Sequence, residues 1–158
     1  MTGIDNSMNS EFTLAEPVTE ADFKKYFEFR WRWLREPWGK SIGSERDEYE
    51  SSAFHVMVLN KDLEIIGVGR LHSIGQHKAQ IRYMAVDEKN RAKGIGTAIL
   101  EKLESHAIRS GATELVLNAR ENAVQFYQHR GYSVTGPADT LFGVIRHKSM
   151  LKRLTFSE

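Results

Sequence analysis

Helical spacing of apolar side chains marks three segments of the chain. In residues 20–35 the apolar side chains fall largely on one helical face, with Thr19 placed to cap the start and Pro37 to end the helix. Residues 95–108 show the same periodicity, and a shorter helix is expected over residues 121–130. We interpret the aromatic stripe of the first helix as a surface that packs against a sheet.

The remaining apolar runs have the character of strands. Alternating or nearly all-apolar patterns predict strands over residues 11–16, 54–59, 63–74, 80–86, 114–117, 132–134 and 141–154. The polar segment 37–52 is predicted to be a loop with a short helix that starts near Glu45. The order is a βα start, a β-meander, a βαβ unit and a final hairpin. It predicts one α/β domain with a mixed sheet.

Composition supports a globular domain and removes several classes of function. The chain has 158 residues, 41% of them hydrophobic, and a domain of this length buries roughly two-thirds of its unfolded surface. It contains 0 cysteines, which excludes disulfides, iron–sulfur clusters, thiolate zinc sites and a cysteine nucleophile. The net charge of +1 gives no bulk field that would hold nucleic acid or an anionic membrane.

The start of the chain gives expectations about compartment and domain limits. Residues 1–10 are polar and lack the basic and apolar regions of a signal peptide. We expect them to form a flexible tail, and residues 11–158 to form a single domain. Nowhere does an apolar run approach the roughly 18 residues of a membrane span. We therefore expect a cytoplasmic protein, either a monomer or a homodimer.

One segment between a predicted strand and helix has the composition of an anion-binding loop. It runs from Arg91 through Lys93, Gly94 and Gly96 to Thr97. Its glycines let backbone N–H groups approach an anion, and the helix start adds its positive dipole end. The order of residues fits neither a Walker A loop nor a dinucleotide fingerprint, because the lysine precedes the glycines and a third glycine is absent. The plainer alternative is a glycine-started helix with solvated basic neighbours.

Two blocks of sequence resemble the GNAT superfamily of CoA-dependent N-acetyltransferases. The family motif (Gln/Arg)-x-x-Gly-x-(Gly/Ala) is present as Arg91-Ala92-Lys93-Gly94-Ile95-Gly96. A second family block is present as Asn122, Ala123, Phe126, Tyr127, Gly131 and Tyr132. Residues 34–39, 43–48 and 145–147 further resemble a bacterial branch that is sometimes fused to a thioesterase domain.

The resemblance implies a fold, an activity and a set of site residues. The implied fold is a mixed, mostly antiparallel sheet, flanked by helices and splayed into a V between the parallel strands 80–86 and 114–118. The implied activity is transfer of an acetyl group from acetyl-CoA to a primary amine of a small molecule, peptide or protein. The implied cofactor-binding residues are Met84, Ala85, Val86, Arg91, Ala92, Lys93, Gly94, Ile95, Gly96, Thr97, Asn118, Asn122 and Tyr127.

Two catalytic roles accompany this assignment. A main-chain N–H near Met84 would stabilise the carbonyl oxygen, and Tyr127 would supply a proton or hydrogen bond to the leaving thiolate. The general base stays open, because the strand leading into the V offers Gln80 and Arg82, and neither is a base. The remaining candidates are Glu45, Asp47, Glu48, His72 and His147, or a chain of water molecules.

The sequence also bears on metal binding, on other functions and on the acceptor. The six histidines show no tight ligand pair with a matching acid, so we expect no metal. A CoA-binding sensor or regulatory module would keep the phosphate loop without turnover, and a structural partner protein would bind no CoA. For the amine acceptor, which stays unidentified, we expect Trp38 and residues 40–47 to form the wall of the site.

Overall fold

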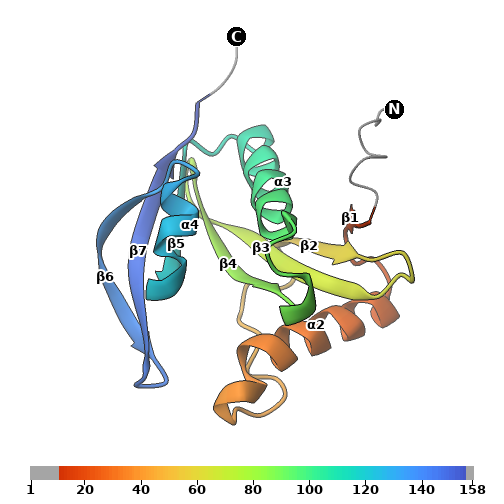
Figure 1. Cartoon of the computed structure of the whole chain (residues 1–158). Coiled ribbons are helices and arrows are strands. Elements are labelled where there is room, and N and C mark those ends of the chain that lie inside the picture. The colour runs from red at the N-terminus through yellow and green to blue at the C-terminus, as the bar shows by residue number, and fades with distance from the viewer. Residues whose placement is uncertain (1–10, 156–158) are drawn as a thin grey trace.

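A seven-stranded sheet with helices on both faces is the frame of the computed structural model, which describes residues 11–155 (Figure 1). The strands are β1 (Thr13–Ala15), β2 (Phe54–Leu59), β3 (Ile65–Gly75), β4 (Lys78–Val86), β5 (Glu114–Arg120), β6 (Ser133–Leu141) and β7 (Ile145–Arg153). The helices are α2 (Glu20–Leu34), α3 (Ile95–Arg109) and α4 (Val124–Gln128), with the 3₁₀ turns η1 (Glu36–Trp38), η2 (Glu88–Asn90) and η3 (Glu121–Ala123). The predicted tail at residues 1–10 lies outside the described residues.

The sheet opens between β4 and β5. The strand order is β1-β2-β3-β4-β5-β7-β6, and β4 with β5 is the one parallel pair among these strands. Their pairing ends at Gln80 and Val116. Beyond this point β4 continues beside β3 to Val86, while β5 continues beside β7 to Arg120, so the two halves of the sheet separate (Figure 1). The V-shaped opening implied by the family resemblance is present.

A β-bulge bends β4 inside this opening. Tyr83 has a φ of 60°, and the register of β3 on β4 shifts between Val68 and Arg70, which leaves Gly69 opposite the bulge. A Cβ atom on Gly69 would lie 2.5 Å from Cγ2 of the buried Ile99 on α3. Glycine at this position therefore lets α3 pack closely against the bulged strand.

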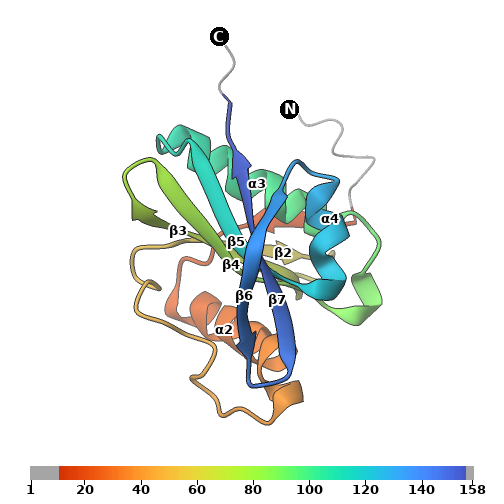
Figure 2. The ribbon, with the colours of Figure 1, turned by 90° about the vertical axis from the view of Figure 1, so that its left-hand side faces the viewer.

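The two faces of the β1–β4 half are covered by different helices (Figures 1 and 2). Helix α3 packs on one face, in a core that includes Ile99 and Leu103. Helix α2 covers the other face, where Tyr26 and Phe27 join Val68 in a second cluster. The predicted packing of the aromatic stripe of α2 against the sheet is confirmed.

The ends of α2 are those that the sequence predicts. The Thr19 hydroxyl accepts a hydrogen bond from the Asp22 N–H at 3.0 Å, and the Asp22 carboxylate accepts one from the Thr19 N–H at 3.1 Å. After Leu34 the chain turns into η1, which contains Pro37. Because local contacts fix both ends of the helix, they also fix the position of its C-cap residue, Arg35, beside the opening of the sheet.

Three predictions about where elements begin or end are wrong. The strand expected at residues 132–134 continues to Leu141 as β6, since β6 is an edge strand that tolerates Pro137 and the shifts in its register. The helix expected over residues 121–130 is shorter, because η3 replaces its first turn and α4 ends at Gln128. β5 also extends beyond the expected residue 117.

The short helix predicted to start near Glu45 is absent, and residues 41–53 form successive turns instead. There the Asp47 carboxylate accepts a hydrogen bond from the Tyr49 N–H at 2.9 Å, and the Glu50 carboxylate accepts one from the Asp47 N–H at 3.0 Å. Such side-chain bonds to nearby backbone compete with helix formation.

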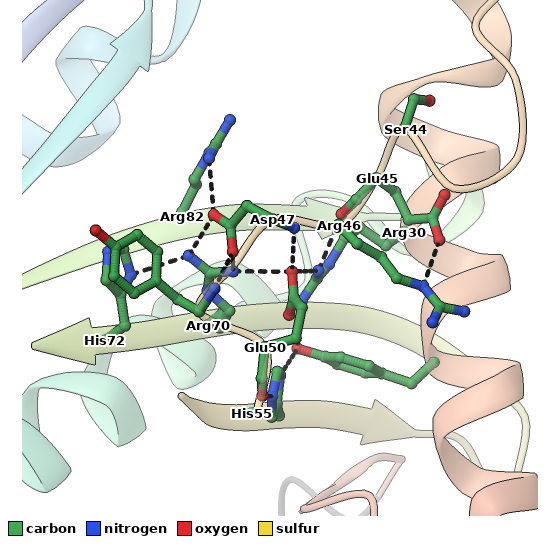
Figure 3. A network of polar contacts seen from close by, with 12 residues as sticks. Arg30, Ser44, Glu45, Arg46, Asp47, Glu50, His55, Arg70, His72 and Arg82 are labelled. Atoms are coloured by element: carbon green, nitrogen blue, oxygen red, sulfur yellow. Dashed lines mark hydrogen bonds and ion pairs between the residues drawn. The ribbon is translucent and has the colours of Figure 1, made fainter. Parts of the chain in front are cut away.

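Buried arginines hold this segment against the sheet (Figure 3). Arg30 on α2 and Arg70 on β3 are both 0% exposed. The Glu50 carboxylate accepts hydrogen bonds from both of them, at 2.8 and 2.9 Å. Arg70 also donates to both oxygens of Asp47, at 2.6 and 2.9 Å. The loop therefore supplies the two carboxylates that these buried cations require.

The same network crosses the sheet in one row. His55 on β2 is the register partner of Arg70 on β3, and Arg70 is the partner of Arg82 on β4. His55 Nδ1 lies 2.9 Å from the Tyr26 hydroxyl, and Arg82 donates to Asp47 at 2.9 Å. The network thus joins α2, three strands and the 41–53 loop. It reaches the bulge through Arg82, which directly precedes Tyr83 on β4.

Asp47 gives this network a pH dependence that can be measured. Burial alone would raise the pKa of Asp47, but hydrogen bonds from Arg70 and the Tyr49 N–H, with the charges of Arg70 and Arg82, lower it well below its usual value. The unfolded state therefore binds more protons as the pH falls below about 4, and the free energy of unfolding falls with it. We expect this fall to be steeper in the wild type than in Asp47→Asn, as measured by urea unfolding from pH 7 to pH 3.

At pH 7 the Asp47→Asn variant should be less stable by about 3 kcal/mol, because Arg70 stays buried with less compensation. The matched control is Asp62→Asn, since Asp62 is exposed in a turn. Parallel pH dependences for the wild type and Asp47→Asn would contradict the assignment.

Candidate active site

The splayed strands enclose a cavity of about 940 Å³. Its walls come from β4, the end of β5, the start of α3, the region of α4, the β6–β7 hairpin and the end of α2. The predicted cofactor-binding residues that line it are Met84, Ala85, Val86, Arg91, Ala92, Gly94, Ile95, Gly96, Thr97, Asn118, Asn122 and Tyr127. Lys93 does not line it; its Nζ atom lies 3.4 Å from Oδ1 of Asn90 on the exposed side of the loop.

The loop before α3 leaves the helix start open toward this cavity. Gly94 is the N-cap residue of α3, with a φ of 83° and no side-chain capping bond, and Ala92 also has a positive φ, of 64°. The first N–H groups of α3 thus keep their hydrogen-bonding capacity for another partner. An anion is the ligand that such a helix start favours.

Three arginines add positive charge to the cavity wall. Arg91 donates to the Val86 carbonyl at 3.1 Å, and Arg130 donates to the Thr97 hydroxyl through two nitrogens, at 3.0 and 2.6 Å. Burial lowers the pKa of Arg120, and the nearby charge of Arg91 lowers it further. Within residues 11–155, none of the three has a carboxylate partner within 4.0 Å. This part of the wall therefore suits phosphate groups.

Arg120 and Arg130 were not among the residues that the sequence singled out. Arg130 acts through Thr97, which lies 33 positions away, so no local spacing connects them. The Thr97 hydroxyl accepts from Arg130, which leaves its own proton available for a ligand. Arg120 ends β5 three residues beyond the predicted limit of that strand, which explains why it was missed.

Tyr127 and Met84 meet on the cavity wall. The Tyr127 hydroxyl donates to the Met84 sulfur at 3.6 Å, and its ring packs edge-on against Phe126 and Tyr132. Tyr127 is 9% exposed, and burial raises its pKa to about 12. The phenol is therefore fully protonated at neutral pH, as a hydrogen-bond donor must be.

Of the five candidate bases, only His147 lines the cavity. Its Nδ1 atom lies 2.9 Å from the Ile145 carbonyl oxygen, which can only accept a hydrogen bond. In the neutral ring, Nδ1 therefore carries the proton and Nε2 keeps its lone pair. His147 on β7 is also the register partner of Arg120, opposite the opened end of β5.

The other four candidates are placed elsewhere. Glu45 is buried and its carboxylate accepts from a backbone N–H within its own turn. Asp47 is held by arginines in the network of Figure 3. His72 accepts a hydrogen bond from Arg70 at Nδ1, and burial lowers its pKa. Glu48 is exposed outside the cavity.

The wall expected for the acceptor is also different. Trp38 and residues 40–47 do not line the cavity, whereas Trp33, Leu34 and Arg35 do. The 41–53 loop lies away from the cavity because its carboxylates form ion pairs with the buried arginines of the network. The end of α2 consequently forms the wall instead.

Residues 11–155 contain no group of three His, Asp or Glu side chains placed to hold a metal ion. No helix within the same residues is long and apolar enough to cross a membrane.

Comparison with known proteins gives the same family as the two sequence blocks. The family described as "Acetyltransferase (GNAT) domain" matches residues 28–154. A protein of Bacillus subtilis (strain 168) named "Uncharacterized N-acetyltransferase YjcF" is 32% identical to this chain over 108 residues, which cover 68% of this chain and 76% of that protein.

Solved structures share the fold. A candidate N-acetyltransferase from Lactobacillus plantarum has a TM-score of 0.79 and 22% identity, over 91% of this chain and 99% of that one. An aminoglycoside 6'-N-acetyltransferase complexed with coenzyme A has a TM-score of 0.75 and 14% identity, over 92% and 99%. At these identities the likeness shows the fold alone, but the family match includes strands β2 to β7 and every residue that lines the cavity. The chain belongs to the GNAT family of acetyltransferases.

Proposed function

We propose that this protein transfers the acetyl group of acetyl-CoA to a primary amine by direct attack of the amine. The observation that carries the proposal is the composition of one cavity wall, on which two opened strand edges, a helix start with unpaired cations and a buried tyrosine donor lie together. Membership of an acetyltransferase family supports the same reaction.

The residues of the wall fit the parts of the donor in order. Beyond Gln80, β4 has backbone groups on the edge that faces β5, and an extended pantetheine arm could pair with them around Met84 and Val86. The pyrophosphate would be held by the N–H groups that follow Gly94 and by Arg91. Acetyl-CoA bound in this way supplies an activated thioester to the centre of the cavity.

The acceptor must lose a proton before or during attack. An alkylamine with a pKa of about 10.4 costs roughly 4–5 kcal/mol to deprotonate at pH 7. We assign the role of base to Nε2 of His147, because this ring is the one candidate that lines the cavity and its Nδ1 atom faces a carbonyl oxygen, which leaves the lone pair on Nε2. A main-chain N–H near Met84 would stabilise the negative charge that develops on the carbonyl oxygen.

Tyr127 would act on the leaving sulfur. Transfer of the proton from a phenol of pKa about 12 to a thiolate of pKa about 8.5 is uphill by about 5 kcal/mol. The tyrosine should therefore stabilise the thiolate by donating a hydrogen bond and keep its own proton. The carbon–sulfur bond breaks as the carbon–nitrogen bond is completed, and the proton lost by the amine leaves through the base.

Binding of the donor is tested by thermal unfolding with and without acetyl-CoA. At about 100 times its dissociation constant, a ligand of the native state adds roughly 2.7 kcal/mol, or about 5–10 °C in Tm. The wild type should show this shift. Gly96→Glu should lose it, because the added carboxylate lies in the first turn of α3 and repels the phosphates.

Gly96→Ala is the matched control, since its Cβ would make ordinary contact with Phe126 at 3.4 Å and it should keep most of the shift. No shift in the wild type would contradict donor binding. A shift without release of thiol against a broad amine panel would favour the sensor alternative.

The role of Tyr127 is tested by Tyr127→Phe. We expect kcat to fall about 10²-fold, while the acetyl-CoA shift in Tm is retained, because the hydroxyl donates to the leaving sulfur only as the bond breaks. Tyr132→Phe is the control: its hydroxyl donates to Glu104 at 2.7 Å, away from the cavity, so it should lower stability and spare kcat. Equal effects of the two variants on kcat would refute the assignment.

The role of His147 is tested by His147→Gln, with the exposed His129→Gln as control. Loss of the base should lower kcat/KM about 10²-fold for an amine of high pKa. An amine of low pKa, already neutral at the assay pH, should lose much less. A change under about 3-fold for both amines would assign the proton to a water chain instead.

A further inference from the structure

Arg35 is a buried cation without a carboxylate partner among the described residues. It follows α2 and is 6% exposed. Its Nε and Nη1 atoms donate to the carbonyl oxygens of Ser44 and Leu34, at 3.1 and 3.0 Å. Within residues 11–155, no carboxylate lies within 4.0 Å of it, and its polar neighbours are those two carbonyl oxygens and the Tyr83 hydroxyl, which is neutral. A buried charge in this state is costly unless a ligand compensates it.

The surroundings of Arg35 add positive charge and aromatic rings. The guanidinium lies 5.6 Å from the ring centre of Tyr83 and 5.3 Å from that of Phe142, on the β6–β7 hairpin. Burial lowers the pKa of Arg35, and the charges of Arg82 and Arg30 lower it further, while Tyr83 opposes these effects. The Nζ atom of Lys40 also lies near Phe142, 4.5 Å from the centre of its ring.

Carboxylates close to this end of the cavity are already in use. Asp47 accepts hydrogen bonds from Arg70 and Arg82, and Glu50 accepts them from Arg30 and Arg70. With Arg35, the three arginines in these bonds make four positive charges, and the two carboxylates balance two of them. Two positive charges remain, and Arg35 and Arg82 are the members of the set that line the cavity.

The cavity wall as a whole shows the same imbalance. Its charged residues are Arg35, Arg82, Arg91, Arg120, Arg130 and Asp139. The last three arginines lie with the phosphate-binding loop, α4 and the end of β5. Arg35 lies at the end of α2, and Arg82 lies on β4, two residues before Met84. The cavity therefore has a second cationic region that the donor's phosphates do not explain.

We infer that the amine acceptor carries a carboxylate, which binds to Arg35 with Arg82 beside it; this inference rests on the proposed acetyl transfer. A guanidinium is the cation whose planar donors match a carboxylate. Arg35 has one nitrogen left to donate, which favours a monoanion over a phosphoryl dianion. A polycationic acceptor would face like charges at this end, at a substantial cost. Asp139 and His147 on the hairpin remain for the amine end.

The test compares acceptors that differ only in the carboxylate. Standard amino acids and ω-amino acids are assayed beside their amides and the corresponding alkylamines, with thiol release as the readout and rates expressed per neutral amine. The wild type should prefer the carboxylates by about 10- to 100-fold in kcat/KM, the range for a hydrogen-bonded charge. Spermidine and phosphoethanolamine serve as polycationic and phosphorylated probes.

The variants separate this inference from the proposed function. Arg35→Gln should lower the preference at least about 10-fold, and Arg35→Lys should restore part of it. Arg32→Gln, on an exposed turn of the same helix, should leave it unchanged. Since Arg35 also holds the loop, Arg82→Gln provides a second variant at a half-exposed side chain. In every variant the acetyl-CoA shift in Tm reports whether the fold and the donor site are intact.

Several outcomes would overturn the inference. These are a wild-type preference for amides, alkylamines or spermidine, a preference for phosphoethanolamine over the matched carboxylate, or an unchanged preference in Arg35→Gln with donor binding intact. Thermal unfolding of the acetyl-CoA complex with each acceptor covers slow turnover: carboxylated amines that neither react nor raise Tm would also overturn it. In all these cases donor binding still stands, whereas loss of the acetyl-CoA shift itself would contradict the proposed function.

Discussion

The separation of β4 from β5 is the constraint on which the rest of this structure depends. Beyond Gln80 and Val116 the two strands no longer share hydrogen bonds, so their facing edges present backbone groups to the cavity. A buried backbone group without a partner costs about 1–3 kcal/mol. An opening of this kind is stable only where water or an extended ligand arm forms hydrogen bonds with those groups. The gap in the sheet therefore suits a ligand that can pair with backbone as a strand does.

The bend of β4 inside this opening is surrounded by buried charge. Tyr83, at the bulge, has guanidinium carbons of Arg30, Arg82 and Arg70 at 4.1, 4.5 and 4.9 Å from its ring centre. Each such contact contributes about 0.5–2 kcal/mol, with the larger values at desolvated sites. The carboxylate of Glu50, shared between two of these arginines, brings the 41–53 loop to the same place. The network therefore fixes the strand and the loop together.

How far the sequence predicts this molecule depends on the distance over which each feature is determined. Helix α2 is predicted almost to the residue because Thr19 and Pro37 act within one turn. The start of α3 after the glycine-containing loop is also predicted, because the residues that determine it are consecutive. The turns around Glu45 are not predictable, since the carboxylates of this segment form ion pairs with arginines that are distant in sequence. The bond between Arg130 and Thr97 and the positive φ of Tyr83 likewise depend on tertiary contacts.

In the proposed reaction, the two cationic regions of the cavity wall would also affect how the amine becomes a nucleophile. Between them the wall includes Met84, Leu117, Ala119 and Tyr127, which are partly or fully buried. Desolvation there disfavours an ammonium ion, and the nearby positive charge of Arg82 disfavours it further, so both effects lower the pKa of a bound amine. A carboxylate at the position of Arg82 would act in the opposite direction. In the proposed reaction, the charge that selects the acceptor would then also reduce the cost of its deprotonation, which lowers the demand on His147 as the base.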